Sequence, residues 1–186
     1  MIDLRSKELP NAIQGADGVI YRIDTSFRTW IEFDRALRQE GVRSDCVLVN
    51  KDVTNDSWQD AAVMFLLNPN STPNYPQSDQ SVRSIDYIQD GEYIYASFMA
   101  AYGIDLTAVD DMHWWKFKAL LQGLPKETKM SEIIGYRTYK HTSKKPEQLY
   151  QEERRAWTLP VDEEAVQEAR DVAAMLWERQ NGGLDG

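Results

Sequence analysis

Cysteine and histidine are scarce in this chain of 186 residues, which contains only Cys46, His113 and His141. A lone cysteine cannot form an intramolecular disulfide, and this fits a reducing compartment. The Cys-x-x-Cys and His-Glu-x-x-His spacings of metal sites are absent, as are a phosphate-binding glycine loop, a dinucleotide fingerprint and a Gly-x-Ser-x-Gly nucleophile elbow. We therefore expect no metal, no cofactor and no catalytic residues, so the chain is not predicted to be an enzyme.

The chain also has fewer basic than acidic residues and no long hydrophobic run. The chain has 21 basic and 30 acidic side chains, a formal net charge of −9 and a pI near 4.8. This balance argues against a globally basic nucleic-acid surface and against attraction to an anionic membrane. The longest wholly apolar stretch, Ala61 to Leu67, is far shorter than the roughly 20 residues of a membrane-spanning helix. No signal-peptide pattern opens the chain. We expect a soluble protein without nucleic-acid or membrane partners.

The charge that is present is unevenly distributed. From Lys116 to Arg155 there are ten basic and five acidic residues, a local excess of +5, so the rest of the chain carries −14. This asymmetry suggests complementary surfaces within the fold, between copies or with a partner. Tyr136, Tyr139 and Tyr150 lie in the basic stretch and could stack on nucleic-acid bases, but +5 within an acidic protein makes that the weaker interpretation.

The pattern of apolar residues predicts a mainly α fold, with six to seven helices and a small N-terminal β-hairpin. The hairpin is expected from Ala12–Ile13 and Val19–Ile23, because these runs flank a turn rich in glycine and aspartate. Prolines at 69, 73 and 76 exclude regular structure from the Asn- and Ser-rich stretch 68–82. We therefore divide the chain into 1–67, a loop at 68–82 and a helical region at 83–186, and one compact domain overall remains an alternative.

Apolar spacing and capping residues mark out the individual helices. In the first, Phe27, Trp30, Ile31 and Leu37 approximate one apolar stripe. The predicted helices run from Thr25 or Ser26 to Gly41, from Ser57 to Leu67, from Ile85 to Tyr102 with an uncertain start, from a cap at Asp110 or Asp111 to Gly123, from Met130 to Tyr139, from Pro146 to Pro160, and from Asp162 to Gly182.

Tryptophan is the most informative residue type in the second half. Trp114 and Trp115 are adjacent, and successive helical residues point about 100° apart. Either this helix is buried on more than one side, or one indole ring faces a partner. His113 beside them is read as a hydrogen-bonded, partly buried side chain rather than a catalytic base or metal ligand.

Several segments resemble a family of small tail proteins from long-tailed bacteriophages, encoded next to the tape-measure gene. The strongest are EYIYASFMAAYGIDL at 92–106, HWWKFKALL at 113–121 and GLP at 123–125. Leu9-Pro10, YRIDTSFRTWI at 21–31, Tyr136-Arg137 and AWTLP at 156–160 also look like that family. The resemblance covers the chain from about Leu9 to Pro160 and leaves the last predicted helix as an extension.

The resemblance implies a tail assembly chaperone in the cytoplasm of the infected bacterial host. Such a chaperone binds the tape-measure protein and keeps it soluble until tail-tube subunits polymerise around it. A tape-measure protein is a long helix with exposed apolar stripes, and such surfaces aggregate unless covered. The tail-tube protein as a second partner and self-association of the chain remain open. The family carries no catalytic motif, in agreement with the inventory above.

We expect the partner groove to be built by the double-tryptophan helix and the helix before it. The candidate partner-binding residues are Tyr95, Phe98, Tyr102, Trp114, Trp115 and Phe117. One alternative is a structural protein retained in the virion. A less favoured alternative is a carboxylate-dependent metal hydrolase, which would need at least three acidic side chains converging in one pocket.

Overall fold

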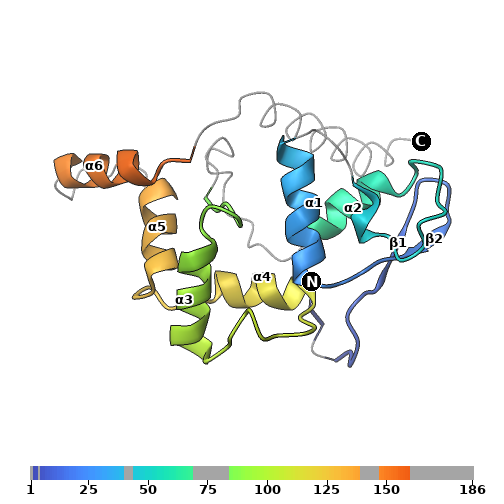
Figure 1. Cartoon of the computed structure of the whole chain (residues 1–186), viewed down its shortest axis with the longest axis horizontal. Coiled ribbons are helices and arrows are strands. Elements are labelled where there is room, and N and C mark those ends of the chain that lie inside the picture. The colour runs from blue at the N-terminus through green and yellow to red at the C-terminus, as the bar shows by residue number, and fades with distance from the viewer. Residues whose placement is uncertain (1, 4, 40–43, 69–83, 139–146, 160–186) are drawn as a thin grey trace, which may run out of the picture.

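The computed structural model describes residues 2–3, 5–39, 44–68, 84–138 and 147–159. Within these ranges it contains six α-helices, one 3-10 helix and a two-stranded antiparallel sheet, which confirms the predicted fold class (Figure 1). In chain order the elements are β1 (Ala12–Gln14), β2 (Ile20–Arg22), α1 (Phe27–Gln39), η1 (Asp45–Val47), α2 (Gln59–Leu67), α3 (Gly91–Tyr102), α4 (Trp114–Gln122), α5 (Lys129–Thr138) and α6 (Glu147–Trp157). The predicted proline-rich loop and last helix lie outside the described residues.

The hairpin forms where the sequence predicts it and packs against the start of α2. Strands β1 and β2 pair with Ile13 opposite Tyr21, and Gly18 takes the positive φ of 79° that the turn needs. The hydroxyl of Tyr21 lies 2.6 Å from a carboxylate oxygen of Asp17 and 2.9 Å from the Ser57 hydroxyl. A short hairpin is marginal alone, so this contact with the residues that lead into α2 stabilises it.

Helix α1 buries the predicted stripe in part and also buries Phe33. Trp30 and Phe33 have no exposed surface, and Phe27 is also buried, whereas Ile31 is only half-buried. The buried face is centred on Trp30 and Phe33 because α1 packs on η1, and the Trp30 ring packs on Phe65 of α2. Ile31 consequently lies at the border of that face and reaches solvent.

Two helix starts also differ from their predicted positions. The segment before α3 is a turn: the carboxylate of Asp86 accepts from the amides of Ile88 and Gln89, and that of Asp90 accepts from the Asp86 amide. These side chains satisfy the backbone without a helix. Helix α3 therefore begins at Gly91, not near Ile85.

Helix α4 is capped by His113, not by Asp110 or Asp111. The Nδ1 atom of His113 accepts from the Trp115 amide at 3.0 Å, and its Nε2 lies 2.9 Å from the Pro10 carbonyl oxygen. Burial lowers the pKa of His113, so the neutral ring can accept at one nitrogen and donate at the other. The prediction of a hydrogen-bonded, partly buried histidine is confirmed.

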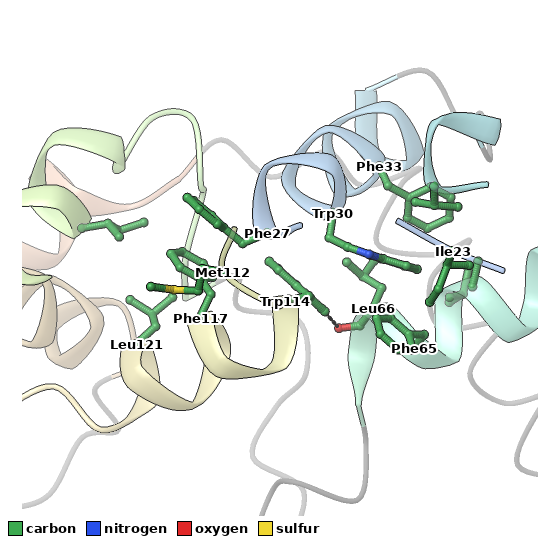
Figure 2. Packing of buried hydrophobic residues seen from close by; sticks show 14 of the residues in the cluster. Ile23, Phe27, Trp30, Phe33, Phe65, Leu66, Met112, Trp114, Phe117 and Leu121 are labelled. Atoms are coloured by element: carbon green, nitrogen blue, oxygen red, sulfur yellow. Dashed lines mark hydrogen bonds between the residues drawn. The ribbon is translucent and has the colours of Figure 1, made fainter. Parts of the chain in front are cut away.

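The core is a continuous cluster that joins both halves of the chain. Figure 2 shows Trp114 at its centre, with Phe27 and Phe117 on one side and Trp30 and Phe65 on the other. Phe27 and Phe117 stack with their ring centroids 4.9 Å apart, and Trp30 and Phe65 lie 4.6 Å apart. These contacts place α4 between the N-terminal elements and the later helices.

A buried ion pair ties the ends of α3, α5 and α6 together. The guanidinium of Arg137 donates to both carboxylate oxygens of Asp90, at 2.5 and 2.8 Å, and both side chains are 1% exposed. The remaining Arg137 donors bond the carbonyl oxygens of Trp157 at 2.7 Å and Ser84 at 3.1 Å. Paired in this way the charges are tolerated in the interior, and removal of one partner would be strongly destabilising.

Candidate partner-binding groove

An open groove of about 380 Å³ lies between α1 and α3, with α4 at its base. In Figure 1, α4 runs from the lower end of α1 toward α3, which lies lower in the view than α1. The groove is lined by Phe27, Arg28 and Ile31 of α1, by Tyr87 of the turn before α3, by Gly91, Ile94 and Tyr95 of α3, by Leu106 and Thr107 of the following loop, and by Phe117 of α4.

The groove is apolar at its base and polar only at its rim. Phe27, Ile94, Leu106 and Phe117 are buried. Ile31, Tyr87 and Tyr95 are half-buried and form its walls, while Arg28 and Thr107 are exposed. A concave surface of this kind, with few polar groups, suits apolar side chains presented by another segment of polypeptide.

A stack of phenyl rings supports the base of the groove. The ring centroid of Phe117 lies 4.9 Å from that of Phe27 and 5.4 Å from that of Phe98, both in stacked geometry. Tyr87 adds a tilted contact with Phe117 at 6.1 Å. Rings held at these distances stabilise one another beyond simple burial, so the base does not need a bound partner to keep its shape.

Arg28 fixes one wall of the groove. Its guanidinium donates to the carbonyl oxygens of Leu106 at 2.8 Å and of Val109 at 2.7 Å, and it lies 4.8 Å from the centroid of the Phe27 ring. The loop after α3 is thereby tied to α1. Within the described part of the chain no carboxylate forms an ion pair with Arg28.

The end of the groove farther along α1 is charged. Ile31 and Tyr87 also border a small neighbouring hollow whose other residues include Asp34, Arg38 and Asp86. Arg38 bonds the buried carboxylate of Asp34 at 2.8 Å. The groove therefore runs from an apolar base to a polar end.

The six predicted partner-binding residues do not share one surface. Tyr95 lines the groove and Phe117 forms its base. Phe98 and Trp114 lie in the core, with exposed fractions of 0% and 1%. A side chain with no exposed surface can shape a binding surface but cannot touch a partner in this conformation.

The other two predicted residues have partners within the fold. Tyr102 donates its hydroxyl proton to the Leu120 carbonyl at 2.9 Å. Trp115 stacks on Phe65 with a centroid distance of 4.9 Å. Sequence reasoning missed the other groove residues: Phe27, Arg28, Ile31, Tyr87, Gly91, Ile94, Leu106 and Thr107. It assigned Phe27 and Ile31 to the apolar stripe of their helix, and apolar spacing does not distinguish a groove residue from a core residue.

The adjacent tryptophans are explained by a contact that we call the carbonyl seam. It comprises Trp114, Trp115 and Lys118 of α4 and the last carbonyl groups of α2. The indole N–H of Trp114 donates to the Leu66 carbonyl at 3.0 Å, that of Trp115 to the Phe65 carbonyl at 3.1 Å, and Lys118 Nζ to Leu66 and Leu67 at 3.0 and 2.7 Å. Both indoles point to the end of α2, whose carbonyls need donors from outside the helix.

Burial lowers the pKa of Lys118 to about 8. The amine is half-buried, lies 5.7 Å from the centroid of the Trp114 ring and faces the negative end of the α2 dipole. Desolvation is the largest influence on its pKa, and the nearby Asp34 carboxylate opposes it. Lys118 can thus change charge near neutral pH.

Among the residues that the structure describes, no group of three or more His, Cys, Asp or Glu side chains converges to hold a metal ion. No helix in that part of the chain is long and apolar enough to cross a membrane.

Comparisons with known proteins give one match. The sequence model of a family described as Bacteriophage Gp15 protein matches residues 6–159, most of the chain. No curated protein and no solved structure matches. The match includes every residue that lines the groove or forms the carbonyl seam, and it ends at the last described residue, Leu159.

Proposed function

We propose that this chain, which belongs to the Bacteriophage Gp15 protein family, is a tail assembly chaperone that binds the tape-measure protein in the groove between α1 and α3. The open apolar groove is the observation that carries the proposal. Its other support is the resemblance to phage tail proteins encoded beside the tape-measure gene. In this proposal the chaperone works in the cytoplasm of the infected bacterium.

The groove has a shape and chemistry that suit one side of an amphipathic helix. Two helices form its walls, its base is apolar, and Arg28 and Thr107 provide polar groups at the rim. Helix-in-groove recognition uses apolar anchors at intervals of three or four residues, and a tape-measure helix repeats such anchors along its length. Covering those anchors would keep the tape measure from aggregating.

Release is as important as binding for such a chaperone. A groove of about 380 Å³ can hold a few side chains of a helix but not the helix itself. The affinity of each single contact would therefore be modest, and tight binding would come from many copies bound along one tape measure. Tail-tube subunits that assemble along the tape measure could then displace the copies one at a time.

Co-expression with the tape-measure protein of the same phage tests the proposal. Wild-type chain should keep the tape measure in the soluble fraction and co-purify with it. Ile31→Lys places a charge on the groove wall, and we expect it to lower the recovered tape measure at least tenfold. Met99→Lys is the matched control, because Met99 is an exposed apolar residue of α3 that does not line the groove.

Two outcomes would overturn the proposal. The groove assignment fails if the folded Ile31→Lys variant recovers as much tape measure as Met99→Lys. The chaperone assignment fails if purified virions contain the chain in fixed copy number, since that result identifies a structural tail component.

A further inference from the structure

We propose that Arg137 of α5 is a positioning residue of the groove, which fixes the turn that carries the wall residue Tyr87 and links that turn to the end of α6. The inference rests on the binding site proposed above and concerns what holds that site in shape. Tyr87 lines the groove, whereas Arg137 and the last residue of α6, Trp157, do not. Both would therefore act on a partner only through other residues.

The guanidinium of Arg137 holds both ends of the turn before α3. At one end it donates to the Ser84 carbonyl at 3.1 Å, and at the other end to the two carboxylate oxygens of Asp90 at 2.5 and 2.8 Å. The same carboxylate accepts from the Asp86 amide at 2.8 Å, which closes the turn. Tyr87 lies between these anchored residues, so the shape of the turn sets where its ring stands.

Tyr87 is the residue that the turn contributes to the groove. Its ring centroid lies 5.5 Å from that of Trp114 and 6.1 Å from that of Phe117, the residue at the base. A residue on a turn depends for its placement on the side chains that anchor the turn, because the regular hydrogen bonds of a helix do not hold it. A wall that is fixed in advance lowers the entropy cost of ordering it when a partner binds.

The end of α6 shares the same guanidinium. The Nε atom of Arg137 donates to the Trp157 carbonyl at 2.7 Å. The Trp157 ring lies edge-on to that of Tyr93 in α3 with centroids 5.3 Å apart, and Lys129 Nζ lies 5.2 Å from the Trp157 centroid. Helix α5 contacts both α3 and α6 (Figure 1). Docking of the Trp157 ring therefore fixes a carbonyl that Arg137 must reach while it also holds the turn.

Arginine is suited to this role, and lysine is not. Arg137 is 2% exposed, and its donors form a rigid planar fork that bonds the turn, the start of α3 and the end of α6 together. A shift of one acceptor would leave a buried donor without its partner, which is costly, so the placement of one segment constrains the other two. A lysine keeps the positive charge beside Asp90 but cannot present this fork.

Hydrogen exchange of the full chain, measured by NMR without a partner, tests the inference. In Arg137→Lys the amides of Asp86 and Asp90 should exchange about tenfold faster relative to the amide of Ile23, because the turn opens locally. The Ile23 amide is bonded to the Asn11 carbonyl in the hairpin and serves as the reference for global unfolding.

A second variant tests the link to α6. Trp157→Ala keeps every hydrogen-bonding group of Arg137, Asp90 and the turn, and it should still speed exchange of the same turn amides several-fold, because the carbonyl at residue 157 is no longer held in place. Arg154→Ala is the matched control, since Arg154 is an exposed residue of α6, and it should leave these rates unchanged. If Arg137→Lys does not fold, Trp157→Ala carries the test, because it leaves the buried ion pair complete.

Three results would overturn the inference. The turn amides could keep their wild-type rates in Arg137→Lys, they could speed up only as much as Ile23, or they could respond equally to Trp157→Ala and Arg154→Ala. Recovery of the tape-measure protein is a separate measurement, and Arg137→Lys should lower it several-fold. A turn that opens locally while recovery stays at the wild-type level would support the positioning role of Arg137 but count against the groove as the binding site.

Discussion

Helix α4 faces two regions of the molecule that are built in different ways. Toward α2 it forms the carbonyl seam, in which Trp114, Trp115 and Lys118 each donate to backbone carbonyls. Toward α1 and α3 it presents Phe117, which forms the base of an open groove. The first region is closed by hydrogen bonds, and the second is left accessible.

The difference shows how neighbouring aromatic residues can have opposite roles. A buried indole N–H needs an acceptor, and the unpaired carbonyls at the end of α2 supply it. A phenyl ring has no such requirement and is stable beneath a groove as long as other rings cover its faces. Trp114 and Trp115 therefore hold α4 against α2, whereas Phe117, which is also buried, lies beneath the groove and shapes its base.

Trp114→Ala should have the largest effect on stability. It removes a fully buried ring and leaves a cavity at the centre of the core, so we expect a loss of about 3–5 kcal/mol in the free energy of unfolding. Urea denaturation followed by circular dichroism measures it. A loss below about 1 kcal/mol would show that the seam does not hold α4 in place.

Trp115→Phe should have a smaller effect, because the ring remains and only one hydrogen bond disappears. The Phe65 carbonyl would lose its donor, and we expect a loss of about 1 kcal/mol by the same denaturation measurement. Trp115→Ala serves as the comparison, since it also removes the stacking on Phe65. No loss in Trp115→Phe beside a clear loss in Trp115→Ala would contradict a role for the indole N–H.

Ile31→Lys should separate stability from binding. Ile31 is half-buried, and the lysine stem can cover the same surface while its amine reaches water. We expect a change in unfolding free energy of about 1 kcal/mol or less, together with the loss of tape-measure recovery described above. If Ile31→Lys unfolds at a much lower denaturant concentration than the wild-type chain, Ile31 is a core residue and not a groove residue.

Lys118 should contribute a pH dependence of stability that is seen only above about pH 8. Its pKa is about 8 in the folded chain and near 10.5 when unfolded. Between these values the unfolded chain binds more protons, so this group raises the free energy of unfolding as the pH rises from about 8 to about 10.5. Below pH 8 Lys118 is protonated in both the folded and the unfolded chain, so its contribution to the free energy of unfolding does not change with pH.

Carbon-13 NMR of the lysine Cε groups measures this titration directly. One signal should titrate near pH 8, and Lys118→Arg should remove it without affecting the other lysines. If every lysine signal titrates near 10.5, Lys118 is not desolvated at the seam.

The success of sequence reasoning differed between the two regions. The sequence predicted the helix containing Trp114 and Trp115 and its stop at Gly123, because these depend on local spacing, and it left burial of both rings as one of two alternatives. The sequence did not predict which carbonyl groups accept from the two indole N–H groups, since Phe65 and Leu66 are about 50 residues away in the chain. The groove was harder still, because its walls come from α1, α3 and the loop after α3.

Individual errors have the same origin. Capping by His113 was missed because a histidine cap needs a second partner for its ring, and Pro10 lies 103 positions away. Phe33 was left out of the α1 stripe although it has no exposed surface in the fold, and the late start of α3 depends on Asp90, whose partner Arg137 comes from α5. In each case a contact distant in sequence changed a local preference.

The sequence by itself determined the mainly helical class, the hairpin, the approximate extent of most helices and the family, because apolar periodicity, capping residues and motifs are local properties. Only the tertiary structure decided which aromatic rings close the core and which lie beneath an open surface. Exposure depends on what packs against a side chain, and those neighbours come from segments that the sequence alone does not bring together.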